Sequence, residues 1–152
     1  METRLPPDFS AFLSSLNASG VEYLVVGGYA VGYHGYSRTT GDIDVWIRQS
    51  PDNAERGVEA IRSFGFDTPN LIRERFLGDG QITRMGLPPN RIEVMTSLSG
   101  VSFDEAWANR ITSDWDGVLV PLIDLRRLRQ NKLASGRLKD LADLDELPNP
   151  DE

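Results

Sequence analysis

Residues 38–47 of the chain read RTTGDIDVWI, and the second half of this stretch alternates polar and apolar residues as a β-strand does. Residues i and i+2 of a strand point to the same face, so Asp42 and Asp44 lie side by side, opposite the apolar residues. Strands normally avoid aspartate. Two adjacent carboxylates either discourage pairing at an exposed sheet edge or hold a divalent cation. The pattern alone leaves both interpretations open.

The composition is that of an ordinary folded protein. The chain has 152 residues, of which 39% are hydrophobic and 26% charged, and we expect one domain, residues 1–152. The absence of cysteine excludes disulfides, thiol catalysis and Cys-ligated zinc. A formal net charge of −7 disfavours a general nucleic-acid coat. The N-terminal residues METRLPPDF lack the apolar core of a signal peptide, so we expect a cytoplasmic protein with no membrane partner.

Hydrophobic spacing and turn residues predict an alternation of helices and strands. The expected strands are 21–26, 42–48, 81–87, 91–96 and 118–120, and the expected helices are 8–16, 29–35, 51–64, 102–109, 125–135 and 137–147. The final helix carries leucines at intervals of three. This order predicts an α/β or α+β fold, a sheet with helices packed on it, with a C-terminal helical part at about 121–147.

Two further features bear on the aspartates. Gly27 and Gly28 end the first strand and lead into a helix, where backbone N–H groups either approach an anion or merely form a tight turn. Glu93 stands on the opposite strand face from Ile92 and Val94. If its strand neighbours the strand of Asp44, Glu93 completes a cluster of three carboxylates; otherwise it is a solvent-facing strand residue.

The combination of a Gly-Gly turn, Arg38-Thr39-Thr40, Asp42-x-Asp44 and a later acidic strand residue resembles the nucleotidyltransferase superfamily related to DNA polymerase β. The stretch from Leu122 to Leu147 also looks like the "dLi..K..a.GR.kDl.Dl..L" ending of the AbiEii-like nucleotidyltransferases, which include toxins of abortive-infection and toxin–antitoxin systems. The resemblance runs from about Val21 to Leu147. It implies a nucleotidyltransferase fold, with a mixed sheet flanked by helices.

The resemblance also implies roles for individual residues. Gly27 and Gly28 would hold the NTP phosphates, and Asp42, Asp44 and Glu93 would be the catalytic and metal-binding carboxylates. The further nucleotide-binding residues would be Arg38, Thr39, Thr40 and Lys132. Arg137 and Asp140 match the family's Arg-x-x-Asp, which either orients the helices through a buried ion pair or belongs to the site. Many relatives have Ser where this chain has Gly28, and Asp where it has Glu93.

The implied function is Mg²⁺-dependent transfer of NMP from an NTP to a hydroxyl of RNA, protein or a small molecule, with Mn²⁺ as a substitute for Mg²⁺. A toxin–antitoxin role with a protein partner encoded nearby belongs to the same resemblance, and tRNA is an acceptor that the net charge does not favour. The alternative is a weakly active or inactive member of the fold that binds a partner or acts as a regulator.

Two other features of the sequence have a functional and a structural interpretation. His34, the only histidine, is either a catalytic residue after the glycine turn or a helix-end residue. A basic cluster in the C-terminal helices is either a nucleotide or RNA contact surface or a solvated helix face. Its members are Arg126, Arg127, Arg129, Lys132, Arg137 and Lys139.

Overall fold

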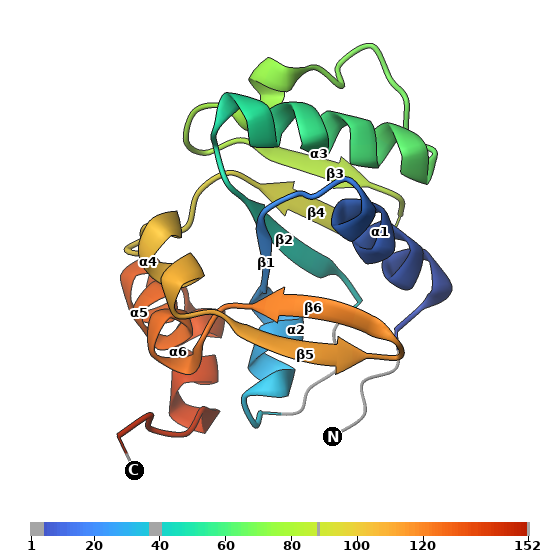
Figure 1. Ribbon diagram of the computed structural model, residues 1–152. Helices are drawn as coiled ribbons and strands as arrows, with labels where there is room; N and C mark the ends of the chain where they lie inside the picture. The colour runs from blue at the N-terminus through green and yellow to red at the C-terminus, as the bar shows by residue number, and fades with distance from the viewer. Residues whose placement is uncertain (1–4, 37–40, 88, 152) are drawn as a thin grey trace.

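The computed structural model describes residues 5–36, 41–87 and 89–151, and Figure 1 shows a twisted sheet with helices on both of its faces. Six strands pair in the order β3-β4-β2-β1-β6-β5. They are β1 (Tyr23–Val26), β2 (Ile43–Ile47), β3 (Ile82–Met85), β4 (Ile92–Met95), β5 (Ile111–Trp115) and β6 (Val118–Leu122). The sheet is mixed, because β2 is parallel to β4 and antiparallel to β1. The predicted fold class is confirmed.

The predicted helices are present in the structure. They are α1 (Pro7–Ala18), α2 (Gly27–Tyr33), α3 (Pro51–Phe64), α4 (Phe103–Ala108), α5 (Leu125–Ser135) and α6 (Leu138–Glu146), with a short 3-10 helix η1 (Arg73–Phe76). The bounds of α3 are those predicted, because the Ser50 side chain accepts a hydrogen bond from the backbone N–H of Asn53 and Gly65 ends the helix at a φ of 120°.

Strand β5 was not predicted from the sequence. It forms an antiparallel hairpin with β6 at the edge of the sheet, through a turn at Asp116 and Gly117. Of its residues only Trp115 is buried, and the others are polar or partly exposed. The strand is therefore specified by its partner and its turn, since its own hydrophobic pattern is too weak to indicate it.

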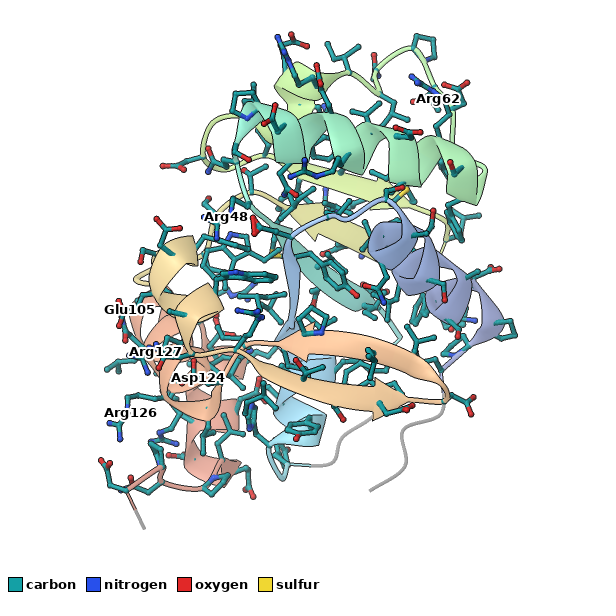
Figure 2. All side chains as sticks on the ribbon, in the orientation of Figure 1. Arg48, Arg62, Glu105, Asp124, Arg126 and Arg127 are labelled. Carbon is teal, nitrogen blue, oxygen red and sulfur yellow. The ribbon has the colours of Figure 1, made fainter. Side chains whose placement is uncertain are left out.

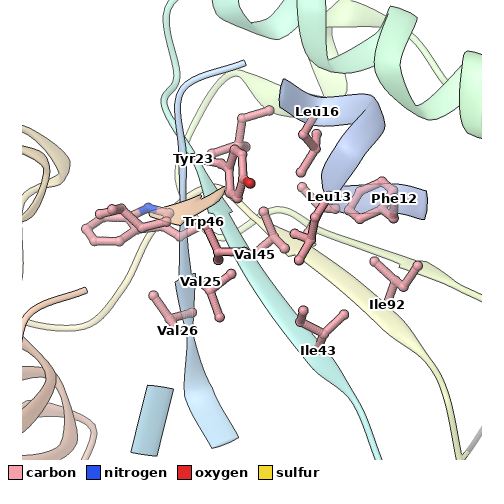
Figure 3. Close-up of a cluster of buried hydrophobic side chains, with 14 of the residues drawn as sticks. Phe12, Leu13, Leu16, Tyr23, Val25, Val26, Ile43, Val45, Trp46 and Ile92 are labelled. Atoms are coloured by element: carbon pink, nitrogen blue, oxygen red, sulfur yellow. The ribbon is translucent and has the colours of Figure 1, made fainter. Parts of the chain in front are cut away.

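One face of the sheet carries the main hydrophobic core. In Figure 3, Phe12 and Leu13 of α1 lie beside Val45 and Ile43 of β2, whereas Trp46 points to the other side of the sheet. Helix α3 packs on the α1 side, where a Cβ on Gly57 would lie 2.7 Å from the end of Ile47. The alternation predicted for RTTGDIDVWI therefore separates a buried apolar face from the face that bears Asp44.

The opposite face is covered by α4 and the C-terminal helices. The Trp46 ring meets Phe103 of α4 edge-on, with the ring centroids 5.0 Å apart. Figure 2 shows Arg127 of α5 near Glu105 and Asp124, and its guanidinium bonds both carboxylates at 3.1–3.2 Å. Asp124 directly precedes α5, where an aspartate commonly caps a helix, but its side chain makes no cap hydrogen bond and binds Arg127 instead.

Helix α6 buries two aspartates and exposes its first leucine, the reverse of an ordinary amphipathic helix. Its leucines predict a helix, which is present, but Leu138 is 87% exposed, while Asp140 and Asp143 are buried. The buried aspartates are explained by Lys132 of α5, which lies between them. Across the described residues, we find no helix with the length and apolar character required to cross a membrane.

Candidate active site

Asp44 and Glu93 lie side by side on neighbouring parallel strands. The pairing of β2 with β4 places Asp44 opposite Glu93, and the pairing of β1 with β2 places Val26 opposite Asp44. The strand of Glu93 therefore neighbours the strand of Asp44, which is the condition under which Glu93 joins the two aspartates. Asp42 directly precedes β2, so all three predicted carboxylates gather near one end of the two strands.

These carboxylates line a cleft of about 800 Å³ between the sheet and the C-terminal helices. This volume lies within the usual range for small-molecule sites, roughly 300–1,000 Å³. The predicted residues at its wall are Gly27, Gly28, Asp42, Asp44, Glu93, Lys132 and Arg137. Arg84, Arg91 and Lys139 also line the cleft, so its cationic side chains outnumber its carboxylates. That balance suits a ligand rich in phosphate.

The glycine turn is pressed against Asp44. Gly27 has a φ of 65°, which favours glycine, and a Cβ added to it would overlap the Asp44 carboxylate, lying 2.9 Å from its Cγ. Gly28 is the second residue of α2 and is buried. Residue 27 must therefore be glycine for two independent reasons, the backbone conformation and the approach of the carboxylate.

A second glycine positions Asp42. A Cβ on Gly41 would collide with the backbone of Pro89, so the loop before β2 lies tightly against the turn before β4. The backbone N–H of Ile43 donates to the carbonyl of Arg91 at 3.0 Å, which fixes the two segments together. The Arg91 Nη2 atom lies 3.1 Å from Asp42 Oδ2 and 3.2 Å from Glu93 Oε1. Arg91 therefore bridges two of the predicted metal ligands.

The acidity of Asp44 is shifted by its surroundings in the cleft. Burial raises its pKa from 3.8 to about 7, helped by the charge of Glu93, a hydrogen bond with Glu93 and the charge of Asp42, while Lys139 opposes the shift. The raised pKa reflects the crowding of like charge around Asp44. The nearby cations do not offset the burial and the like charges that act on Asp44.

Lys132 is buried between two aspartates. Its Nζ lies 3.1 Å from Asp140 Oδ1 and 3.1 Å from Asp143 Oδ2. Arg137 donates from Nε to Asp140 Oδ2 at 2.8 Å, although 71% of the Arg137 side chain is exposed. Burial opposes ionisation of Asp140, but hydrogen bonds from Arg137, Ser135 and Lys132 hold its pKa well below the usual range. The ion pair suggested for Arg137 and Asp140 is present, and Lys132 completes it.

The remaining predicted residues are placed as follows. Arg38, Thr39 and Thr40 lie outside the described residues. His34 ends α2, and its Nε2 donates to the carbonyl of Ile123 at 2.8 Å, while burial lowers its pKa. This environment favours the helix-end interpretation of His34.

Much of the basic cluster joins structural elements. Arg126 pairs with Asp151, Arg127 links α4 to the start of α5, and Arg129 donates to backbone carbonyls at the end of α6. Lys139 is exposed at the cleft. The cluster is therefore divided between helix packing and the cleft, with Lys132, Arg137 and Lys139 on the cleft side.

Arg84 and Arg91 are the site residues that the sequence analysis missed. Arg84 Nε lies 3.1 Å from Glu93 Oε1, across the β3–β4 hairpin from it. Arg91 is two residues before Glu93 and so shares its strand face, which was a usable signal. The contact of Arg91 with Asp42 joins segments 49 residues apart, and only the folded sheet reveals it.

The cleft carboxylates are chemically suited to bind a hard divalent cation, but they are not already arranged around one point. Carboxylate oxygens are the ligands that Mg²⁺ prefers, and a cation would relieve the repulsion of Asp44 by Glu93 and Asp42, which helps to raise the pKa of Asp44. Within the described residues, however, no three Asp, Glu, His or Cys side chains are already arranged around one point. Arg91, not a third carboxylate, lies between Asp42 and Glu93.

Comparisons with known proteins agree with this architecture. No family model matches the sequence, and no curated protein matches it. A solved structure from Thermotoga maritima, TM1012, assigned as a nucleotidyltransferase, superposes with a TM-score of 0.59 at 17% identity, covering 94% of each chain. The fold is that of the nucleotidyltransferases.

Two other solved structures share this fold. The lincomycin-bound lincosamide antibiotic adenylyltransferase LnuA has a TM-score of 0.54 at 12% identity, with 95% of this chain and 97% of LnuA covered. An antigenic nucleotidyltransferase-like protein from Paracoccidioides brasiliensis has a TM-score of 0.53 at 17% identity, covering 90% of this chain and 72% of that one. At such identities the similarity establishes the nucleotidyltransferase fold, while activity must be argued from the cleft.

Proposed function

We propose that the protein is an Mg²⁺-dependent nucleotidyltransferase that moves NMP from an NTP to a hydroxyl group of an acceptor. The observation that carries the proposal is one cleft in which Asp44 and Glu93 lie opposite each other on paired strands, beside the Gly27 turn and under a wall of arginine and lysine side chains. The nucleotidyltransferase fold of the chain supports it.

In this proposal each part of the cleft has a chemical role. The backbone N–H groups at Gly27 and Gly28 and the side chains of Arg137 and Lys139 bind and orient the triphosphate. Bound at Asp42, Asp44 and Glu93, Mg²⁺ or Mn²⁺ would supply activation of the hydroxyl and stabilisation of the leaving pyrophosphate.

The proposed reaction forms one bond and breaks one. The acceptor oxygen bonds to the α-phosphorus as the bond from that phosphorus to the pyrophosphate oxygen breaks. Glu93 takes the hydroxyl proton, as a general base in contact with Asp44. Lys132 contributes by holding Asp140 and, through it, Arg137 at the cleft wall. The products are a nucleotidylated acceptor and pyrophosphate.

The alternative, a partner-binding module without catalysis, is favoured by one observation. Arg84 and Arg91 both contact Glu93, and Arg91 also contacts Asp42, so the cleft carboxylates have protein partners without any metal. Under this alternative the arginines keep the fold stable and nucleotide does not bind. A toxin–antitoxin role belongs to either function and is tested by whether a small neighbouring gene encodes a protein that binds the purified chain.

Nucleotide binding separates the two functions. We expect each favoured NTP to raise the melting temperature of the wild-type chain only when Mg²⁺ is present. The double variant Asp42→Asn/Asp44→Asn should lose this shift. The chain offers a matched control in a second Asp-x-Asp, at the β5 turn, so Asp114→Asn/Asp116→Asn should keep it. No shift with any NTP would favour the partner-binding module.

Transfer itself is measured with α-³²P-labelled NTPs and three acceptors: total tRNA, a protein extract and lincomycin. Label should enter one acceptor class with wild-type protein and not with the Asp42→Asn/Asp44→Asn variant. Transfer retained by that variant would eliminate the assignment of these aspartates as metal ligands.

A further inference from the structure

Arg91 occupies the position in which a cation would join the cleft carboxylates. A single nitrogen, Nη2, contacts both Asp42 Oδ2 and Glu93 Oε1, and the side chain is 31% exposed at the cleft wall. These are the same two carboxylates that the proposed metal requires. One positive group, already supplied by the chain, therefore holds them together.

The bridge leaves one hydrogen-bond donor of the arginine unsatisfied. The Arg91 Nε–H is buried and has no hydrogen-bond partner among the described residues. Arg137 provides the contrast, because its Nε and Nη2 both bind Asp140. A buried donor without an acceptor is costly, and guanidinium groups bind carboxylate and phosphate best through two nitrogens. The Arg91 side chain thus stands to gain from an acceptor that uses Nε as well.

Arg91 could leave the carboxylates for such an acceptor by a movement of its side chain alone. The carbonyl of Arg91 accepts from Ile43 N–H, and β4 begins at the next residue, so its backbone is fixed to β2. A divalent cation at Asp42 and Glu93 would repel a guanidinium bound to the same oxygens. The guanidinium would then turn into the cleft, where phosphate oxygens offer a two-nitrogen contact.

We propose that Arg91 is an exchangeable counter-ion: it bridges Asp42 and Glu93 while no metal is bound, and transfers to the triphosphate when Mg²⁺ and nucleotide enter the cleft. The inference rests on the proposed function, since it requires a metal at these carboxylates. The exchange makes metal and nucleotide binding cooperative, because metal binding releases Arg91 from the carboxylates and the released Arg91 then binds the nucleotide. Arg84 does not have this role, since it pairs with Glu93 and does not bridge Glu93 to Asp42.

The first test measures Mn²⁺ binding without nucleotide, from the electron paramagnetic resonance signal of free Mn²⁺. Removal of the competing cation in Arg91→Gln should tighten Mn²⁺ binding about tenfold. Lys139→Gln is the charge-matched control, because Lys139 lines the same cleft and acts on Asp44 through space. It should change Mn²⁺ binding by less than about threefold.

The second test measures the binding of a non-hydrolysable ATP analogue at saturating Mg²⁺. Arg91→Gln should weaken it about tenfold, the reverse of its effect on Mn²⁺. Arg91→Lys keeps the charge but not the two-nitrogen contact, so it should bind Mn²⁺ like wild type and still bind the analogue more weakly. Opposite changes in the two affinities of one variant are not expected of a structural role.

The outcomes are separable. Unchanged or weaker Mn²⁺ binding by a folded Arg91→Gln variant would overturn the exchange while leaving the proposed function intact. Absence of Mn²⁺ binding by wild type and variant alike would overturn both. If Arg91→Gln does not fold, ¹⁵N-arginine spectra of the wild type provide the test, with the Arg91 Nε resonance assigned by its loss in Arg91→Lys. This resonance should shift when Mg²⁺ is added and shift again when the ATP analogue is added. A resonance that neither addition shifts would refute the proposal.

Discussion

Two groups of carboxylates in this molecule, one buried between helices and one half-buried at the cleft, differ in how their charge is balanced. The helix cluster, Asp140 and Asp143 around Lys132, is closed: the ammonium sits between the carboxylates, and the pKa of Asp140 is held well below its usual range. At the cleft, Asp44 beside Glu93 has a pKa raised to about 7. The helix cluster holds the structure together, whereas Asp44 lies beside like charges that a bound cation would offset.

The largest effect is expected where the closed cluster is broken. Lys132→Met leaves Asp140 and Asp143 buried without their ammonium, and removal of one partner from a buried ion pair costs about 3–5 kcal/mol. We expect the free energy of unfolding in urea to fall by that amount. Lys139→Met, an exposed neighbour on α6, should change it by less than about 0.5 kcal/mol.

This comparison also separates the two roles considered for Lys132. If the lysine acted only on phosphate, Lys132→Met would unfold at the wild-type urea concentration and lose only nucleotide binding. A loss of stability below about 1 kcal/mol would therefore refute the structural role that the contacts indicate.

The same contrast explains what could be predicted from sequence. The fold followed from strong local patterns, such as the alternation in residues 42–48 and the capped helix 51–64, because burial of one face acts over a few neighbouring residues. The three carboxylates could be nominated because their spacing places them on strand faces. Their resemblance to a family supplied the suggestion that they act together.

What the sequence did not predict depends on contacts between distant segments. The bridge from Arg91 to Asp42, the burial of Lys132 and the pairing of β5 all arise when segments meet in the folded sheet. The spacing of the leucines in α6 correctly predicted a helix but did not indicate which face of that helix is buried. That side is set by the ion pairs, which no local pattern reveals.

A smaller effect, of opposite sign, is expected at the cleft. Because the folded-state pKa of Asp44 is raised, the folded protein binds a proton more tightly than the unfolded chain between pH 4 and 7. Its contribution to stability therefore falls as pH rises through this window and is least favourable above pH 7. Asp44→Asn should stabilise the metal-free protein by about 1–2 kcal/mol at pH 8 and by almost nothing at pH 4.

Thermal or urea unfolding at the two pH values, in the presence of EDTA, measures this difference. Asp42→Asn is the matched control, because it removes a carboxylate that contacts Arg91 and should not stabilise the protein. Equal effects of Asp44→Asn at pH 4 and pH 8 would show that the pKa of Asp44 is not raised in the folded protein. Stabilisation combined with loss of the Mg²⁺-dependent nucleotide shift would identify Asp44 as a residue kept for function at the expense of stability.

The smallest effect is expected at Leu138, and it completes the comparison. If α6 is held by the charges of the helix cluster, its exposed leucine should contribute little, although leucines usually anchor a helix to its neighbours. Leu138 is 87% exposed, so Leu138→Ser should change the free energy of unfolding by less than about 0.5 kcal/mol. Leu128→Ala, fully buried on α5, should cost about 2–5 kcal/mol. A loss above about 1 kcal/mol in Leu138→Ser that grows with protein concentration would mean that Leu138 is covered by a second copy of the chain, and that apolar burial as well as the ion pairs holds α6 in place.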